Sequence, residues 1–348
     1  MNIWYRIIIL VLLFTPFSAR IARAENEAFL LQYEFVKDDI LKYKMKIKNT
    51  IDTTIGGEQQ RTKNKTGFVW IQKVKDVDKI GTASIEATYK SVKASINVGF
   101  MRNIYYDSTL EDSDRNQSML SAAFNSMIGK NFIINVAKEG EVLSVSGFKE
   151  ILDGIVANLP GGPMRMAMAD QFSQFYNDET MTGLIQNVFH ILPNEKIQIG
   201  GSWSRDMIMP TTIIPVRIKS IYTFKDVRRF KGKKCAVIEI DTKIESVSNK
   251  KETQILDREE GGPDFLISIK NGHGNGLFYF DIDKGRLIES TITAEFDVFV
   301  EMVMELAYIN ISGEDDGGLD FNNPAGMNIE QNIKTTISME LLKYQISK

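Results

Sequence analysis

Residues 288–300 read IESTITAEFDVFV, and this stretch decides the fold. Every even position from Ile288 to Val300 holds an apolar or small side chain, while the odd positions from Glu289 to Asp297 are polar. Successive side chains of a β-strand point to opposite faces of the sheet, so a period of two gathers the apolar set on one face. The stretch therefore predicts a half-buried antiparallel strand, apolar toward the core and polar toward water.

The same alternation recurs at two distant places, residues 43–48 and residues 329–341. In the first, Tyr43, Met45 and Ile47 alternate with three lysines. The stretches at 288–300 and 329–341 exceed the usual strand length of about 5–6 residues. Because strands twist, a sheet of long strands curls. We expect an α+β fold, with long antiparallel strands in one or two curved sheets of the open half-barrel type.

Two glycines mark tight turns between such strands. Residues 135–143 and residues 280–288 each read as strand, turn, strand, with Gly140 and Gly285 in the turns. Short hairpins need positive φ, which glycine adopts without steric cost. Both stretches are therefore predicted to be β-hairpins.

Helical periodicity is confined to two regions. One helix is expected near residues 115–128, where apolar residues recur at a spacing of 3.6. Residues 146–193 read as a helical insert with three stripes, over 148–159, 164–175 and 181–192. Amphipathic helices must bury their stripes, so we expect the insert to pack on the apolar face of the sheet.

The N-terminus has the three parts of a secretory signal peptide. Arg6 precedes an apolar run over residues 7–14, and Ala22-Arg23-Ala24 forms a small-x-small cleavage site. The run is too short for a bilayer, which needs about 20 apolar residues, and no second long run predicts a membrane span. The protein is expected to be exported, to the periplasm or outside the cell.

These patterns divide the chain into four segments. We expect a signal peptide over 1–24, a β-rich half with one helix over 25–145, the helical insert over 146–193 and a second β-rich half over 194–348.

Composition narrows the function classes. The net charge is −3, and removal of a leader with three basic residues leaves 39 basic against 45 acidic residues, a net charge of −6. Such a chain has no overall electrostatic attraction for nucleic acid or for anionic membranes. The single cysteine, Cys235, excludes an intramolecular disulfide, and its strand-like surroundings favour a buried side chain over a reactive thiol.

No motif predicts a catalytic, cofactor or metal site. The chain has only two histidines, His190 and His273, too few for the ligand sets that zinc requires. The glycine-rich residues 271–276 precede a strand rather than a helix, so a flexible loop is favoured over a phosphate cradle. The acidic residues 314–320 are expected to form a solvated loop rather than a calcium site. An enzyme is not favoured, although the sequence leaves the question open.

Methionines and phenylalanines gather in the helical insert, and they are the candidate ligand-binding residues. Methionine-rich surfaces adapt to varied apolar partners, which favours a ligand site, while packing of the helices on the sheet accounts for the same residues. The candidates are Met164, Met168, Phe172, Phe175 and Met181.

Three short stretches occur together in a known pattern: residues 188–193 (VFHILP), 196–203 (KIQIGGSW) and 276–287 (GLFYFDIDKGRL). In this combination the chain resembles a family of exported bacterial β-rich proteins of unknown function. The resemblance implies a location in the bacterial envelope. It brings no activity and no functional residue.

Two functions remain open. The first is a non-enzymatic envelope protein that binds an apolar or amphiphilic ligand, such as a lipid, between the curved sheet and the helices. The second is a structural or interaction module that binds another envelope protein through an exposed apolar patch. Neither involves nucleic acid or a cofactor.

Overall fold

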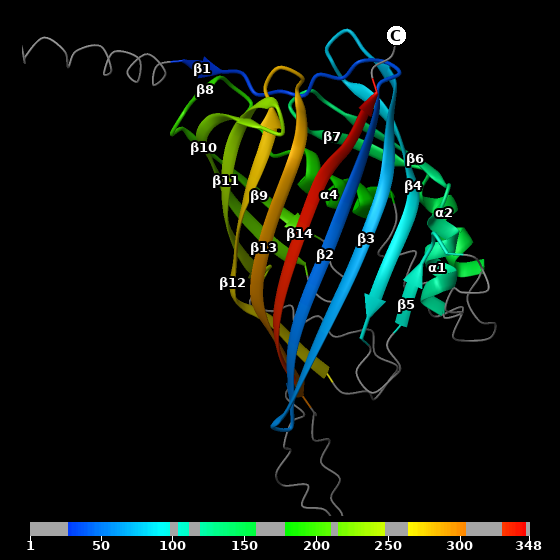
Figure 1. Cartoon of the computed structure of the whole chain (residues 1–348). Coiled ribbons are helices and arrows are strands. Elements are labelled where there is room, and N and C mark those ends of the chain that lie inside the picture. Colours follow the sequence, from blue (N-terminus) through cyan, green and yellow to red (C-terminus); the bar gives the residue numbers. More distant parts are fainter. Residues whose placement is uncertain are drawn as a thin grey trace, which may run out of the picture.

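Figure 1 shows the computed structural model, which describes residues 27–97, 104–110, 119–157, 178–209, 215–247, 264–303 and 329–345. Within these residues the chain is mostly strand, with few helices. The strands of the large sheet are β2 (Ile40–Ile55), β3 (Glu58–Val77), β4 (Ala83–Ile96), β5 (Ile104–Asp107), β6 (Asn131–Val136), β7 (Val142–Ser146), β9 (Ser202–Met209), β10 (Val216–Phe230), β11 (Lys233–Ser246), β12 (Asp264–Asp281), β13 (Arg286–Val303) and β14 (Ile329–Gln345). The remaining elements are β1 (Ala28–Phe29), β8 (Ile197–Gln198), α1 (Met119–Met127), α2 (Phe148–Ala157) and α4 (Asp178–Phe189).

One antiparallel sheet of 12 strands dominates the molecule. Its order is β7-β6-β4-β3-β2-β14-β13-β12-β11-β10-β9, and β5 pairs with β4 beside this path. The predicted strands at 43–48, 288–300 and 329–341 are confirmed within β2, β13 and β14, which are the neighbouring strands at the centre of the sheet. β2 and β14 pair along their whole length, so the early and late strands of the chain share one sheet.

Both predicted hairpins are present. β6 and β7 pair around Gly140, which has a φ of 90°, and β12 and β13 pair around Gly285, which has a φ of 50°. The glycine-rich residues 271–276, in contrast, do not form the predicted flexible loop, because they lie inside β12.

The glycines of β12 serve close packing within the sheet. A Cβ atom on Gly276 would lie 2.4 Å from the carbonyl oxygen of Thr291, and one on Gly272 would lie 2.2 Å from that of Ile244. The pairing of β12 with β13 also shifts register between Lys270 and His273. Glycines and bulges at such places allow a strand to bend sharply, which accounts for glycines in the middle of a long strand.

Helix α4 lies behind the long strands in Figure 1 and contacts both edge strands of the sheet, β7 and β9. The sheet therefore curls around this helix, and the face that holds the core is its concave face. The helix also occupies the free edge of β7. The side chain of Gln186 accepts a hydrogen bond from the Val142 amide at 2.6 Å, and that of Thr182 accepts one from the Val145 amide at 3.1 Å. Covering an edge in this way removes a template for aggregation.

The segment after α4 is bonded to the opposite edge strand. The Trp203 indole of β9 donates to the Ile191 carbonyl at 3.2 Å, and the Arg205 guanidinium donates to the Leu192 carbonyl at 2.5 Å. The edges of the sheet do not pair with each other among the described strands, and α4 with its extension spans the gap between them.

Residues 28–36 cross one end of the curved sheet, and we call them the strap. β1 of the strap pairs with β8. The Tyr33 amide donates to the Lys138 carbonyl at 2.7 Å, and the Glu34 amide donates to the Gly285 carbonyl at 3.0 Å. The Tyr33 hydroxyl donates to the Phe189 carbonyl at 3.0 Å. The strap thus joins both hairpins to the end of α4.

The core fills the concave face beneath the strap. Side chains from the strap, from α2 and α4 and from the adjoining ends of the strands form one buried cluster, whose most enclosed members include Leu31, Ile85, Ile151, Ile191, Phe224, Ile238 and Phe280. The first and third predicted helical stripes are present as α2 and α4, which contribute to this cluster. The second predicted stripe, 164–175, lies outside the described residues.

Substitution of Gly140 by alanine tests the docking of the strap and α4 on the β6–β7 hairpin. A Cβ there would lie 2.2 Å from the Phe189 carbonyl oxygen. Gly57 is a matched control, because its φ of 87° is nearly the same while nothing lies within 4 Å of its Cβ position. We expect Gly140→Ala to lower the free energy of unfolding by about 3 kcal/mol and Gly57→Ala by about 1 kcal/mol. Urea denaturation measures both, and equal losses would contradict the packing described.

Candidate functional site

Below the core, the concave face carries three apolar rows across β13, β14 and β2, which we call the rungs. Each rung consists of one side chain from each strand in direct cross-strand register. The rungs are Ile292–Ile337–Ile47, Phe296–Ile333–Ile51 and Val300–Ile329–Ile55. The same alternation that places Tyr43 and Met339 in the core places the rungs on that face.

The rungs differ from the core in their exposure. Met339 and Tyr43 are buried, whereas Ile337, two residues farther along β14, is 37% exposed. Ile55, at the far end of β2, is 42% exposed. The core cluster therefore ends at about the first rung, and the apolar face continues beyond it as a trough. The other rung side chains are half-buried, and Val298, on β13 between the second and third rungs, is buried. Exposed apolar surface of this kind on one face is a common feature of binding sites.

On β14 and β2 polar side chains separate the rungs, whereas β13 carries Ala294 and Val298 at the corresponding positions. Thr335 and Asn49 lie between the first and second rungs, and Gln331 and Thr53 lie between the second and third. The Gln331 amide donates to the Thr53 hydroxyl at 3.4 Å. The carbonyl oxygen of the Asn49 side chain is buried and has no hydrogen-bond partner among the described residues. A buried acceptor without a partner is uncommon, and it offers a hydrogen bond to a ligand in the trough.

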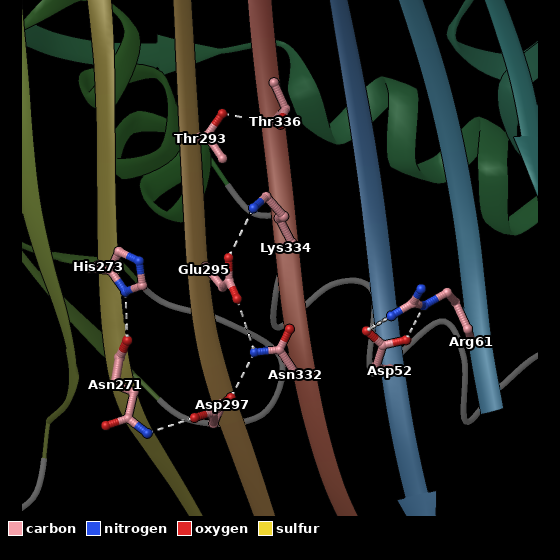
Figure 2. A network of polar contacts seen from close by, with 10 residues as sticks. All are labelled: Asp52, Arg61, Asn271, His273, Thr293, Glu295, Asp297, Asn332, Lys334 and Thr336. Carbon is pink, nitrogen blue, oxygen red and sulfur yellow. Dashed lines mark hydrogen bonds and ion pairs between the residues drawn. The ribbon is translucent and has the colours of Figure 1, made fainter. Parts of the chain in front are cut away.

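The convex face of the same strands is polar, as Figure 2 shows. Glu295 accepts from Lys334 at 3.1 Å, and Asp297 accepts from Asn332 at 2.8 Å and from Asn271 at 2.7 Å. The hydrogen bond from Lys334 lowers the pKa of Glu295, and those from Asn332 and Asn271 lower the pKa of Asp297. The network links β12, β13 and β14 on the convex face. Its charged and polar groups make this the solvent-facing side of the sheet.

The structure describes one of the five candidate ligand residues. Met181 lies in α4, is 8% exposed and packs within the core cluster. Met164, Met168, Phe172 and Phe175 lie outside the described residues. The alternation in β2, β13 and β14 already indicated the apolar face, but periodicity alone does not show which part of it the helices leave uncovered.

The other features from the sequence analysis add no candidate site within the described residues, and the acidic residues 314–320 lie outside them. Cys235 is fully buried, as predicted, and burial beside the Asp281 carboxylate raises the pKa of its thiol to about 11. No group of three or more metal-binding side chains occurs among the described residues. A depression of about 690 Å³ over β9 to β12 is lined by lysine and aspartate side chains together with His273. None of the helices in the described part of the chain combines the length and hydropathy needed to cross a bilayer.

Comparison with protein families gives one match. Residues 81–285, more than half of the chain, match the model of a family of unknown function, DUF6263. No curated protein sequence matches the chain.

Similar solved structures are distant. A structure of lipovitellin, titled for its lipid–protein interactions, has a TM-score of 0.41 and 8% identity, and covers 90% of this chain. This chain spans 26% of that lipovitellin chain. OmpF from Salmonella typhi, in complex with daunomycin, has a TM-score of 0.22 and 10% identity. The match covers 87% of this chain and 98% of the OmpF chain. A DUF1329 family protein from Desulfovibrio piger has a TM-score of 0.11 and 10% identity. The match covers 95% of this chain and 92% of that protein. At these TM-scores the likenesses carry no conclusion.

The pH dependence of stability tests the environment of His190, which follows α4. Burial and the Arg205 guanidinium lower the pKa of its imidazole, against a weaker opposite effect of Glu141. The unfolded chain, with a histidine pKa of about 6.5, then binds more protons than the folded chain in mild acid. We expect the free energy of unfolding to fall as the pH drops through about 6.5, and to fall less in His190→Gln. Urea midpoints at neutral and mildly acidic pH measure this, and equal declines would contradict it.

Proposed function

We propose that this protein binds an apolar or amphiphilic ligand in the trough of the concave sheet face. The chain belongs to the family of unknown function DUF6263, so the proposal rests on the geometry of the chain itself. The observation that carries the proposal is the line of three apolar rungs that continues beyond the core, with Ile337 and Ile55 exposed. A sheet face of this kind is stable in water only when helices, another sheet or a ligand cover it.

The shape of the molecule supports a ligand that lies along the strands. The strap and the core close one end of the concave face, and α4 spans the two edges of the sheet there. The rungs extend from this closed end toward the β2–β3 hairpin. An extended chain entering from that side would meet one rung after another and stop at the core.

The energetics are sufficient for such a ligand. Burial of each methylene group contributes about 0.8 kcal/mol, so an alkyl chain of about ten carbons gains about 8 kcal/mol before the losses of association. A loss of about 4 kcal/mol on association leaves a net gain of about 4 kcal/mol, a dissociation constant of about 1 mM. An alkyl chain of about 15 carbons raises the net gain to about 8 kcal/mol, a dissociation constant of about 1 μM. The polar rows, with the free acceptor of Asn49, suit a ligand that also carries a hydroxyl or amide group.

The N-terminal sequence supports the place of action. Arg6, the apolar run over 7–14 and the Ala22-Arg23-Ala24 site support export, and the envelope is where we propose that the protein acts. The interaction module stays the alternative, in which another protein covers the trough.

Substitution at the core end of the trough tests ligand binding. Ile337→Glu places a carboxylate on the concave face, and Ser338→Glu places one on the convex face, opposite Lys46. Desolvation of a carboxylate against an alkyl chain opposes binding, so we expect Ile337→Glu to weaken binding of a fluorescent fatty acid at least about tenfold and Ser338→Glu to leave it unchanged. Fluorescence titration of the full chain measures both.

Mass spectrometry of the solvent-extracted native protein complements the titration. A stoichiometric lipid that Ile337→Glu lacks and Ser338→Glu retains is the expected result. The proposal fails when the wild-type protein carries no lipid and binds no fatty acid. A stoichiometric protein partner in its place would favour the interaction module.

Export predicts a shortened chain. We expect the intact mass of the protein from its native host to correspond to a chain beginning at Glu25, and the protein to appear in the fraction released without cell lysis. Mutation of Ala22 and Ala24 to bulky residues should block the cleavage, because signal peptidases require small side chains there. An unprocessed protein confined to the cytosol would contradict export.

A further inference from the structure

The lower parts of β2 and β3, residues 44–67, form an arm that ends in the hairpin at Gly56 and Gly57. Figure 1 shows this hairpin at the lower end of the long strands, away from the strap. The concave side of the arm carries members of all three rungs. Its convex side carries the arm lysines: Lys44, Lys46, Lys48, Lys63 and Lys65.

The arm lysines lack ion-pair partners among the described residues. Four of them are exposed, and Lys44 is half-buried. Lys48 and Lys65 are direct cross-strand neighbours, an arrangement in which like charges destabilise a sheet. Several other lysines of the large sheet are paired with acids, as in Lys219–Glu245, Lys225–Glu239, Lys243–Glu245 and Lys334–Glu295.

Two acids beside the arm lysines are already bonded to other cations. Asp52 accepts two hydrogen bonds from Arg61, at 2.5 and 2.9 Å, and Glu340 accepts from Lys231. Lys63 acts on Asp52, and Lys46 and Lys44 act on Glu340, only through space. The arm thus keeps a concentrated positive charge on a chain whose net charge is −3.

We propose that the convex side of the arm docks on an anionic lipid bilayer. The argument is charge complementarity: lysines near a negatively charged bilayer each strengthen binding about fivefold, and their alkyl stems reach the interface without strain. This inference goes beyond ligand binding, because it concerns the opposite face of the strands and depends on charge.

Vesicle flotation of the full chain tests the proposal. Lys48→Gln/Lys65→Gln removes two arm lysines. The control Lys79→Gln/Lys284→Gln removes the same charge from exposed lysines in the hairpins near the strap. We expect wild type to bind vesicles of phosphatidylcholine with about one third phosphatidylglycerol, and the arm variant to bind about 25-fold more weakly, with the control near wild type. Binding should vanish on pure phosphatidylcholine, and also as the ionic strength rises toward about 1 M.

Two results would overturn the proposal: no binding of wild type to the anionic vesicles, or equal losses in the arm variant and the control. Fatty-acid titration without vesicles separates this inference from ligand binding. Lys48→Gln/Lys65→Gln should bind the fatty acid as wild type does, and Ile337→Glu should still float with anionic vesicles. Thermal unfolding of each variant shows that the sheet is intact.

Discussion

The structure depends on one constraint: a single antiparallel sheet has one apolar face, and that face must be covered. The alternation in β2, β13 and β14 continues for the whole length of these strands, but the described helices and the strap cover it only at one end. There the hydrophobic effect gives a buried cluster in which Phe224, Ile238 and Phe280 are almost fully enclosed. Toward the β2–β3 hairpin, the described helices and the strap leave Ile337 and Ile55 exposed on the same face. Core and trough therefore have the same apolar composition, and they differ in whether the strap and the helices cover them.

Curvature makes this cover possible with few helices. Because the sheet bends, its edge strands β7 and β9 both reach α4, and one helix serves both edges. Glycines permit the close backbone contacts that this bending brings about. Gly140 lies against the Phe189 carbonyl and Gly285 against the strap, while Gly272 and Gly276 let β12 bend beside its neighbours. The hairpin glycines thus have two tasks, positive φ and close packing, and only the first is visible in a local stretch of sequence.

The two faces of the arm carry the two proposed activities. Its concave side has apolar rungs suited to an alkyl chain, and its convex side has lysines without acidic partners. A protein that takes a lipid from a bilayer needs both properties at the same end. Average charge does not reveal this, because the acids that balance the chain lie elsewhere or already bind other cations, as Asp52 binds Arg61. Local surface charge decides association with a charged partner over distances of about a Debye length.

The sequence by itself determined that residues 288–300 and 329–341 form strands and which side of each strand is apolar, because a period of two is a local property of these stretches. It also located the hairpins at Gly140 and Gly285, since positive φ is a local requirement. Tertiary structure alone decided that β2 pairs with β14, that residues 271–276 lie within a strand and that Ile337 is left exposed. Each of these depends on neighbours far away in the chain: the backbone beside Gly276 comes from β13, and the cover that ends before Ile337 comes from the strap and the helices.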